Sequence, residues 1–156
     1  IDTAALEKSY FQMQRLLHPD RFATRTPKEK TLSQQQATSL NDAYETLKDP
    51  LARAAYLANL MGRDVLKEDG NGPVDPMILM EAMEMREALA EAETAEDVAT
   101  VTKRAQGEIA DCESELSDAF AADDLDQAAS LITRLKYLRK LADDTRARRA
   151  ELRGRG

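Results

Sequence analysis

The sequence predicts an all-α protein made of two helical domains. Of its 156 residues 42% are hydrophobic, but only six are Gly and five are Pro, a composition that favours helices. Apolar residues recur at helical spacing, and the one turn-rich run is Glu68-Asp69-Gly70-Asn71-Gly72-Pro73. We therefore expect a helical hairpin over 1–62, a linker over 63–74 and an antiparallel three-helix bundle over 75–156.

The first predicted helix begins after Asp2, which is placed to cap it, and ends before Pro19. Its apolar residues recur at i, i+4, i+7 and i+11 and are Leu6, Tyr10, Met13 and Leu17. Pro19 has no N–H to donate and disfavours helical geometry at His18, so the chain turns into solvent there. The exposed loop His18-Pro19-Asp20 contains the only histidine of the chain. The alternative is a helix end that has these residues without a function.

The second predicted helix begins at a capping box with proline at its first position, Thr26-Pro27-Lys28-Glu29, and ends at Asp49-Pro50. Its apolar stripe consists of Leu40, Ala43, Tyr44 and Leu47. A short helix over 51–61 follows, and Gly62 is suited to end it. The hairpin is thus a helix, an exposed loop and an antiparallel helix.

Three longer helices are predicted beyond the linker. Their N-terminal signals are Asp75-Pro76, Thr94 with Asp97, and Asp124 with Gln127. The apolar stripe of the last is Leu125, Ala128, Leu131, Ile132 and Leu135. Because the connections are short, consecutive helices are expected to run antiparallel.

Cys112, the only cysteine, is predicted to be a core residue. It lies in the stripe Val98, Val101, Ala105, Ile109, Cys112, Leu116 and Phe120 of the second bundle helix. One cysteine cannot form an internal disulfide, and one cysteine with one histidine cannot supply a four-ligand zinc site. We therefore expect a reducing compartment and no metal or cofactor.

The first bundle helix has apolar residues on two faces. Its core stripe is Ile78, Ala82, Met85 and Leu89. The opposite face combines apolar and acidic side chains, namely Leu79, Met80, Met83, Glu84, Glu87 and Glu91. Exposed apolar residues fringed by carboxylates indicate a protein-binding patch, which Tyr137 of the third helix could join. The alternative is a wide stripe that packs on both sides in a tight bundle.

Charge is unevenly divided along the chain. Residues 62–130 have a net charge of −14 and residues 131–156 a net charge of +6. The acidic stretch argues against nucleic acid as the main ligand, and the Arg-rich tail over 146–156 has no aromatic residue for base stacking. The tail arginines are expected to lie at the fraying end of a helix and are Arg146, Arg148, Arg149, Arg153 and Arg155. No apolar run reaches the roughly 18 residues of a membrane span, and no signal peptide is visible.

Two pairs of segments resemble one protein family. YFQMQRLLHPDRF with SLNDAYETLKDPLARAAYL resembles a J-domain, the module with which co-chaperones trigger ATP hydrolysis in a DnaK-class chaperone. DPMILMEAMEMREALAEA with LITRLKYLRKL resembles the C-terminal domain of the HscB family, J-domain co-chaperones that deliver the iron–sulfur scaffold protein to such a chaperone. The resemblance covers nearly the whole chain, with both halves in the order and spacing of the family.

The resemblance implies two sets of binding residues. Those implied to engage an HscA-type chaperone are His18, Pro19, Asp20, Arg21, Lys8 and Arg15. Those implied to bind an IscU-type scaffold are Leu79, Met80, Met83, Glu84, Glu87, Glu91 and Tyr137. Family members begin with a short helix before the one that starts at Asp2, which this sequence lacks. Some eukaryotic members have paired CxxC motifs, and their absence here favours a bacterial type.

The expected protein is therefore an L-shaped, cytoplasmic adaptor of iron–sulfur cluster biogenesis that stimulates the ATPase of its chaperone and binds neither nucleic acid nor membrane. It is not expected to be an enzyme, because no nucleophile or metal cluster lies near its lone histidine in the sequence. Three alternatives stay open. They are a J-domain co-chaperone with another client, a nucleic-acid-binding protein that uses the Arg-rich tail, and a small hydrolase with His18 as general base.

Overall fold

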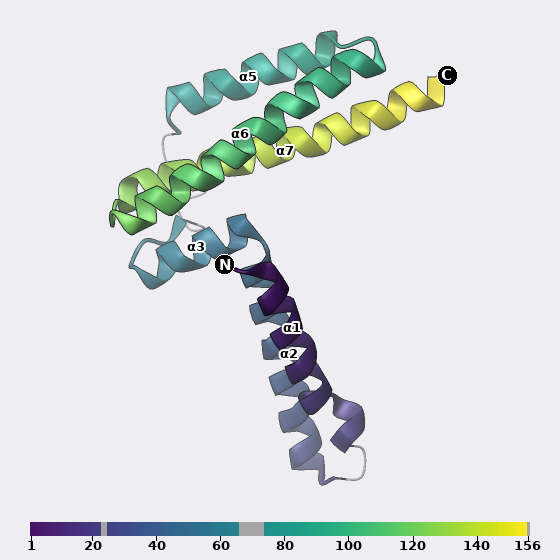
Figure 1. Ribbon diagram of the computed structural model, residues 1–156, viewed down its shortest axis with the longest axis vertical. Helices are drawn as coiled ribbons and strands as arrows, with labels where there is room; N and C mark the ends of the chain where they lie inside the picture. The colour runs from purple at the N-terminus through teal and green to yellow at the C-terminus, as the bar shows by residue number, and fades with distance from the viewer. Residues whose placement is uncertain (23–24, 66–73, 156) are drawn as a thin grey trace. The chain divides into compact units, whose positions relative to one another are not determined.

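The computed structural model describes residues 1–22, 25–65 and 74–155 (Figure 1). Helices are the only regular elements within these ranges, which confirms the predicted all-α class. The chain divides into two compact units, Ile1–Tyr56 and Leu57–Gly156. This division falls inside helix α3 (Pro50–Leu60), whereas residues 66–73 of the predicted linker lie outside the described residues.

The first unit is a helical hairpin. Helix α1 (Thr3–Leu17) lies along α2 (Pro27–Lys48), and a short 3-10 turn, η1 (Pro19–Phe22), follows α1 (Figure 1). Both predicted caps are confirmed. Asp2 accepts a hydrogen bond from the Ala5 N–H at 3.1 Å, and Thr26 accepts one from the Glu29 N–H at 3.2 Å.

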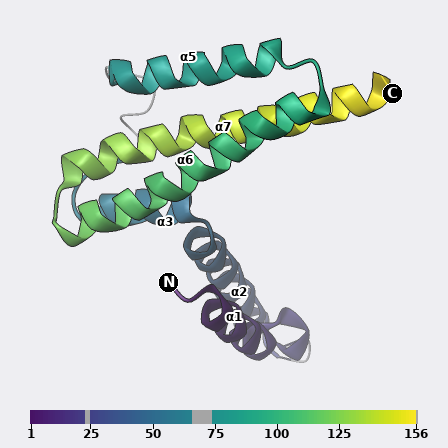
Figure 2. The ribbon, with the colours of Figure 1, turned by 45° about the horizontal axis from the view of Figure 1, so that its top comes forward.

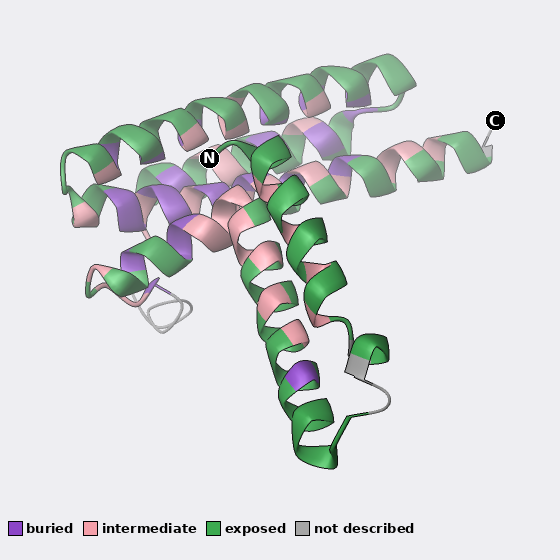
Figure 3. Cartoon of the chain, turned by 60° about the horizontal axis from the view of Figure 1, so that its bottom comes forward, coloured by how far each residue is buried: buried purple, intermediate pink, exposed green. Residues whose placement is uncertain are grey.

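Tyr10 is the main contact between the two helices of the hairpin. Its ring stacks on that of Tyr44 with centroids 4.0 Å apart, and its hydroxyl donates to Asn41 Oδ1 at 2.5 Å. The predicted apolar faces are only partly covered, because the Met13 side chain is 48% exposed and Ala43 is exposed. Exposed and half-buried residues cover most of α1 and α2 in Figure 3. Part of the apolar surface of the hairpin is therefore exposed.

Helix α3 ends as its sequence predicts. Gly62 has a φ of +94°, the left-handed conformation that a side chain would strain. With this turn in place the Arg63 N–H reaches the Ala58 carbonyl at 2.8 Å and the Gly62 N–H reaches that of Asn59 at 3.0 Å. The glycine thus satisfies carbonyl groups that a helix end leaves unpaired.

The second unit contains three antiparallel helices, α5 (Pro76–Glu91), α6 (Ala95–Ala121) and α7 (Leu125–Arg155), which lie side by side in Figures 1 and 2. The three predicted N-terminal caps are all present, and the box of Thr94 and Asp97 is reciprocal. None of the described helices combines the length and apolarity that crossing a membrane requires. The bundle prediction is therefore confirmed in its helices, their order and their starts.

The bundle core consists mainly of the predicted stripes (Figure 3). Its buried side chains on α5 are Ile78, Met85 and Leu89, and on α6 they are Val98, Val101, Ala105, Cys112, Leu116 and Ala119. Those on α7 include Ala128, Leu131, Ile132, Leu135, Leu138 and Leu141. Helices α6 and α7 contact each other along most of their length, and α5 contacts both.

Cys112 makes the stability of the bundle sensitive to high pH. Its fully buried thiol donates to the Leu131 carbonyl at 3.3 Å, and burial raises its pKa from 9.0 to about 11. The thiol ionises at a lower pH in the unfolded chain than in the folded protein. The folding stability that the buried, protonated thiol contributes below pH 9 is therefore lost as the pH rises toward 11. Urea unfolding at increasing pH should show a loss on the order of 2 kcal/mol that Cys112→Ala lacks. Equal losses in both proteins would contradict this prediction.

Candidate protein-binding sites

The loop His18-Pro19-Asp20 is held outside the hairpin by a tight turn. Helix α1 ends at Leu17, and His18 has a φ of −58° and a ψ of 131°, as expected for a residue before proline. The Arg21 N–H then donates to the His18 carbonyl at 3.0 Å. His18, Asp20 and Arg21 are exposed, as predicted, whereas the side chain of Pro19 lies outside the described residues.

The two polar side chains of this loop are linked through the backbone. The Asp20 N–H donates to Nδ1 of His18 at 3.2 Å. One Asp20 carboxylate oxygen lies 3.6 Å from the same nitrogen. The Asp20 side chain is 91% exposed, so its carboxylate is presented to solvent on a fixed turn.

Arg21 and Ser33 donate hydrogen bonds to backbone carbonyl groups at the C-terminal end of α1. The Arg21 guanidinium donates to the Arg15 carbonyl at 3.2 Å, and the buried Ser33 hydroxyl donates to the Leu17 carbonyl at 3.0 Å. Arg21, predicted to contact a chaperone, therefore also supports the loop. Lys8 and Arg15 are exposed on α1, and their spacing of i and i+7 places them on one face. No sequence signal identified Ser33, because its partner is sixteen residues away.

The predicted apolar patch on α5 is exposed. Leu79 is 41% exposed, Met80 56% and Met83 63%, while Ile78, Met85 and Leu89 face the core. This excludes the alternative of a wide core stripe. Met77, which was not among the predicted patch residues, is 71% exposed and lies one turn before Met80. Here the α5 patch means Met77, Leu79, Met80 and Met83.

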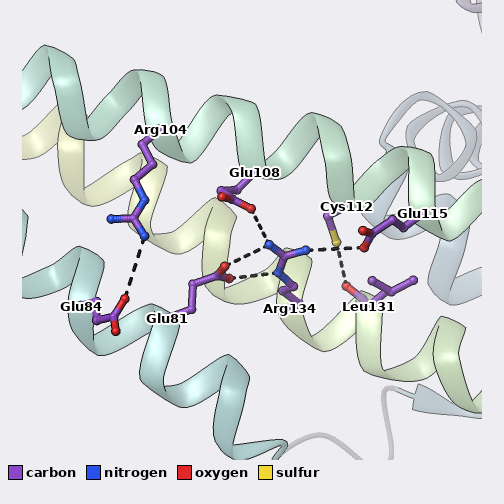
Figure 4. A network of polar contacts seen from close by, with 8 residues as sticks. All are labelled: Glu81, Glu84, Arg104, Glu108, Cys112, Glu115, Leu131 and Arg134. Atoms are coloured by element: carbon purple, nitrogen blue, oxygen red, sulfur yellow. Dashed lines mark hydrogen bonds and ion pairs between the residues drawn. The ribbon is translucent and has the colours of Figure 1, made fainter.

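Acidic side chains border the α5 patch. Glu84, Glu87 and Glu91 are all exposed on α5, and Tyr137 is half-buried on α7. Glu84 also lies 4.0 Å from the guanidinium of Arg104 on α6 (Figure 4). The apolar patch with its carboxylate border suits a partner surface that is apolar at its centre and basic at its edge.

Arg134 of α7 joins all three bundle helices (Figure 4). Its guanidinium makes two 3.0 Å hydrogen bonds to the carboxylate of Glu81 on α5, one of 2.5 Å to Glu108 and an ion pair at 3.6 Å with Glu115. The hydrogen bonds to Glu81 raise the pKa of Arg134 above its usual value. Sequence analysis did not predict this network, because its members lie on three different helices.

Arg148 of the C-terminal tail makes a contact that was not predicted. Its side chain is only 23% exposed, and it donates to the Ala92 carbonyl at the end of α5 at 3.0 Å. It also pairs with Glu151 at 3.0 Å. As predicted, the tail arginines lie at the end of a helix, which continues to Arg155, and Arg148 also caps another helix. Arg146, in contrast, is 78% exposed.

Comparison with known proteins identifies the family that the chain resembles. Residues 74–146 match the model of the HSCB C-terminal oligomerisation domain. The chain is 36% identical over 155 residues to the human iron–sulfur cluster co-chaperone protein HscB, covering 97% of this chain and 64% of that protein. It is 36% identical over 152 residues to the co-chaperone protein HscB homolog of Vibrio vulnificus, covering 92% of this chain and 86% of that protein.

A solved structure supports the same relationship. The chaperone HscB from Vibrio cholerae is similar with a TM-score of 0.84 and 33% sequence identity, covering 97% of this chain and 91% of that chain. Identity above 30% over most of a relative's length, together with the family match to the bundle, shows common descent. The chain therefore belongs to the HscB family.

Proposed function

We propose that this protein is a co-chaperone of iron–sulfur cluster biogenesis, which binds the cluster scaffold protein through its bundle and stimulates the ATPase of a DnaK-class chaperone through its hairpin. The observation that supports this best is the exposed α5 patch with its acidic border, located in the domain that matches the HscB family. Side chains of this size and chemistry are those expected at the centre of a protein interface.

The scaffold is proposed to be of the IscU type, and it would bind the patch with Glu84, Glu87, Glu91 and Tyr137 at its edge. Titration of the purified scaffold into this protein, followed by calorimetry, tests the proposal directly. We expect 1:1 binding in roughly the micromolar range, because burial of a few Leu and Met side chains is partly offset by the entropy of association. A titration without heat at millimolar scaffold would contradict it and would favour another client.

The hairpin is proposed to bind an HscA-type chaperone. Asp20 offers a fully solvated carboxylate beside His18, and Lys8 and Arg15 offer positive charge on α1. In this proposal the protein is cytoplasmic and performs no catalytic chemistry of its own. His18 accepts a hydrogen bond from the neighbouring backbone, which fits a role in shaping the loop.

The two binding functions are expected to be separable. Because Lys8 and Arg15 are exposed on α1, Lys8→Ala/Arg15→Ala should weaken chaperone binding, and more so at about 50 mM salt than at about 300 mM, where charges are screened. Scaffold affinity, measured by the same titration, should stay unchanged. A control with the same change of charge is Lys103→Ala/Arg146→Ala, at exposed sites of the bundle, which should leave chaperone binding intact. Loss of scaffold binding in the Lys8/Arg15 variant would contradict this division.

A further inference from the structure

Helix α5 is attached to the bundle by little apolar packing. It buries three of its 16 side chains, Ile78, Met85 and Leu89, and it contacts α6 and α7 less than these two helices contact each other. Of the three, only Ile78 lies in the first two turns of α5. A cleft of about 450 Å³ opens beside these turns and is bordered by Met77, Met80 and Arg134 among others. Apolar contacts alone therefore fix the N-terminal half of α5 poorly, although this half contains the whole α5 patch.

Arg134 supplies the missing attachment. Its side chain is 19% exposed and that of Glu81 23%, so their paired hydrogen bonds are largely shielded from water (Figure 4). The planar guanidinium meets the carboxylate in a two-bond fork, which fixes direction as well as distance. Glu108 and Glu115 of α6 hold the guanidinium from the other side. The hydrogen bonds from Arg134 of α7 to Glu81 thus fix the rotation of α5 about its own axis.

Glu81 is adjacent in sequence to Met80 and precedes Met83 by two residues. Because side chains on a helix keep fixed angles to one another, the direction of Glu81 determines the direction of the α5 patch. At the far end of α5 the Arg148 guanidinium binds the Ala92 carbonyl at 3.0 Å. Both attachments come from α7, so the patch is oriented by one helix at two points.

We propose that Arg134 is a positioning residue for partner binding. It holds α5 in one orientation, so that the α5 patch is formed before the partner binds. This inference rests on the proposed function, because it assigns a further residue to the same binding surface. A buried ion pair contributes little net stability compared with apolar side chains of similar volume. The pair of Arg134 and Glu81 instead fixes the orientation of α5.

The expected signature is kinetic. If α5 holds the binding orientation for only a fraction of the time, the apparent affinity falls to that fraction of its full value, and the loss appears in the association rate constant. Arg134→Met should therefore lower the association rate constant for the scaffold by about tenfold and change the dissociation rate constant by less than about twofold. Met80→Ala should do the opposite, because Met80 is exposed for direct contact and its loss speeds dissociation. Loss of a positive charge near an acidic border would speed the approach of a basic partner, so slower association cannot arise from steering.

The experiment measures both rate constants by stopped-flow mixing of the full chain with purified iron–sulfur scaffold protein. Arg146→Met on the exposed face of α7 is the matched control and should leave both rates unchanged. Amide hydrogen exchange should accelerate in α5 of the Arg134→Met protein and not in α6. Glu81→Gln is a milder variant that keeps the pairing of Arg134 with Glu108, and its effect on association should not add to that of Arg134→Met.

Three outcomes would overturn the inference. They are an unchanged association rate in Arg134→Met, a loss confined to dissociation, and additive effects of the two substitutions. Failure of the proposed function is a separate result. In that case the unsubstituted chain does not bind the scaffold at all, and hydrogen exchange alone then decides whether Arg134 seats α5.

Discussion

Simultaneous replacement of Leu79, Met80 and Met83 by Ala is expected to weaken scaffold binding by about 100-fold or more with little change in melting temperature. Burial of a Leu or Met side chain is worth roughly 1.5 to 3 kcal/mol, so the three together could contribute a gross 5 to 9 kcal/mol to an interface. Part of this is offset by the entropy of association. In the free protein the three side chains are 41–63% exposed, so truncation removes little packing.

Met85→Ala provides the matched control for this prediction. It removes the same kind of side chain from the same helix, but Met85 is fully buried. Its truncation should cost about 2 to 5 kcal/mol of folding free energy and lower the melting temperature. A melting curve and a calorimetric titration of both variants test the pair. Early melting of the triple variant would show that its side chains stabilise the bundle, and unchanged affinity would show that the scaffold binds elsewhere.

Asp20→Asn is expected to abolish stimulation of the chaperone ATPase while changing the free energy of unfolding by less than about 0.5 kcal/mol. The Asp20 side chain is 91% exposed, so its loss removes no packing. The substitution keeps the backbone N–H that donates to His18 and removes only the negative charge. His18→Gln should have the same effect on the ATPase.

Chaperone ATPase rates with increasing amounts of each variant test this prediction, and urea unfolding checks the fold. Asp118→Asn makes the same change at an exposed site in the bundle and should leave stimulation intact. Retained stimulation by a folded Asp20→Asn protein would show that the loop does not act on the chaperone. The assignment of the hairpin to chaperone binding would then be wrong.

Features whose partners are close in the sequence could be predicted. Caps such as that of Thr94 and Asp97 depend on residues three positions apart, and the end of α1 depends on Pro19 and the residue before it. The exposure of Leu79, Met80 and Met83 was predictable because helical spacing fixes the angle between a core residue and its neighbours. The roles of these residues in binding stay predictions.

Features whose partners are distant in the sequence were not predicted. Arg134 pairs with Glu81 across 53 positions, and Arg148 reaches Ala92 across 56, so neither contact has a local signal. Sequence periodicity also overestimated the packing of Met13 and Ala43, because a helical stripe predicts which face is apolar and not how much of that face a neighbour covers.

The thin packing of α5 has a consequence for the molecule under thermal stress. Segments with few buried contacts open at lower free energy than the rest of a fold, and α6 with α7 retains most of the core when α5 opens. We therefore expect heating to displace the binding surface before α6 and α7 unfold. Scaffold in excess stabilises the folded state that it binds by mass action. Binding is therefore expected to protect α5 from opening on heating.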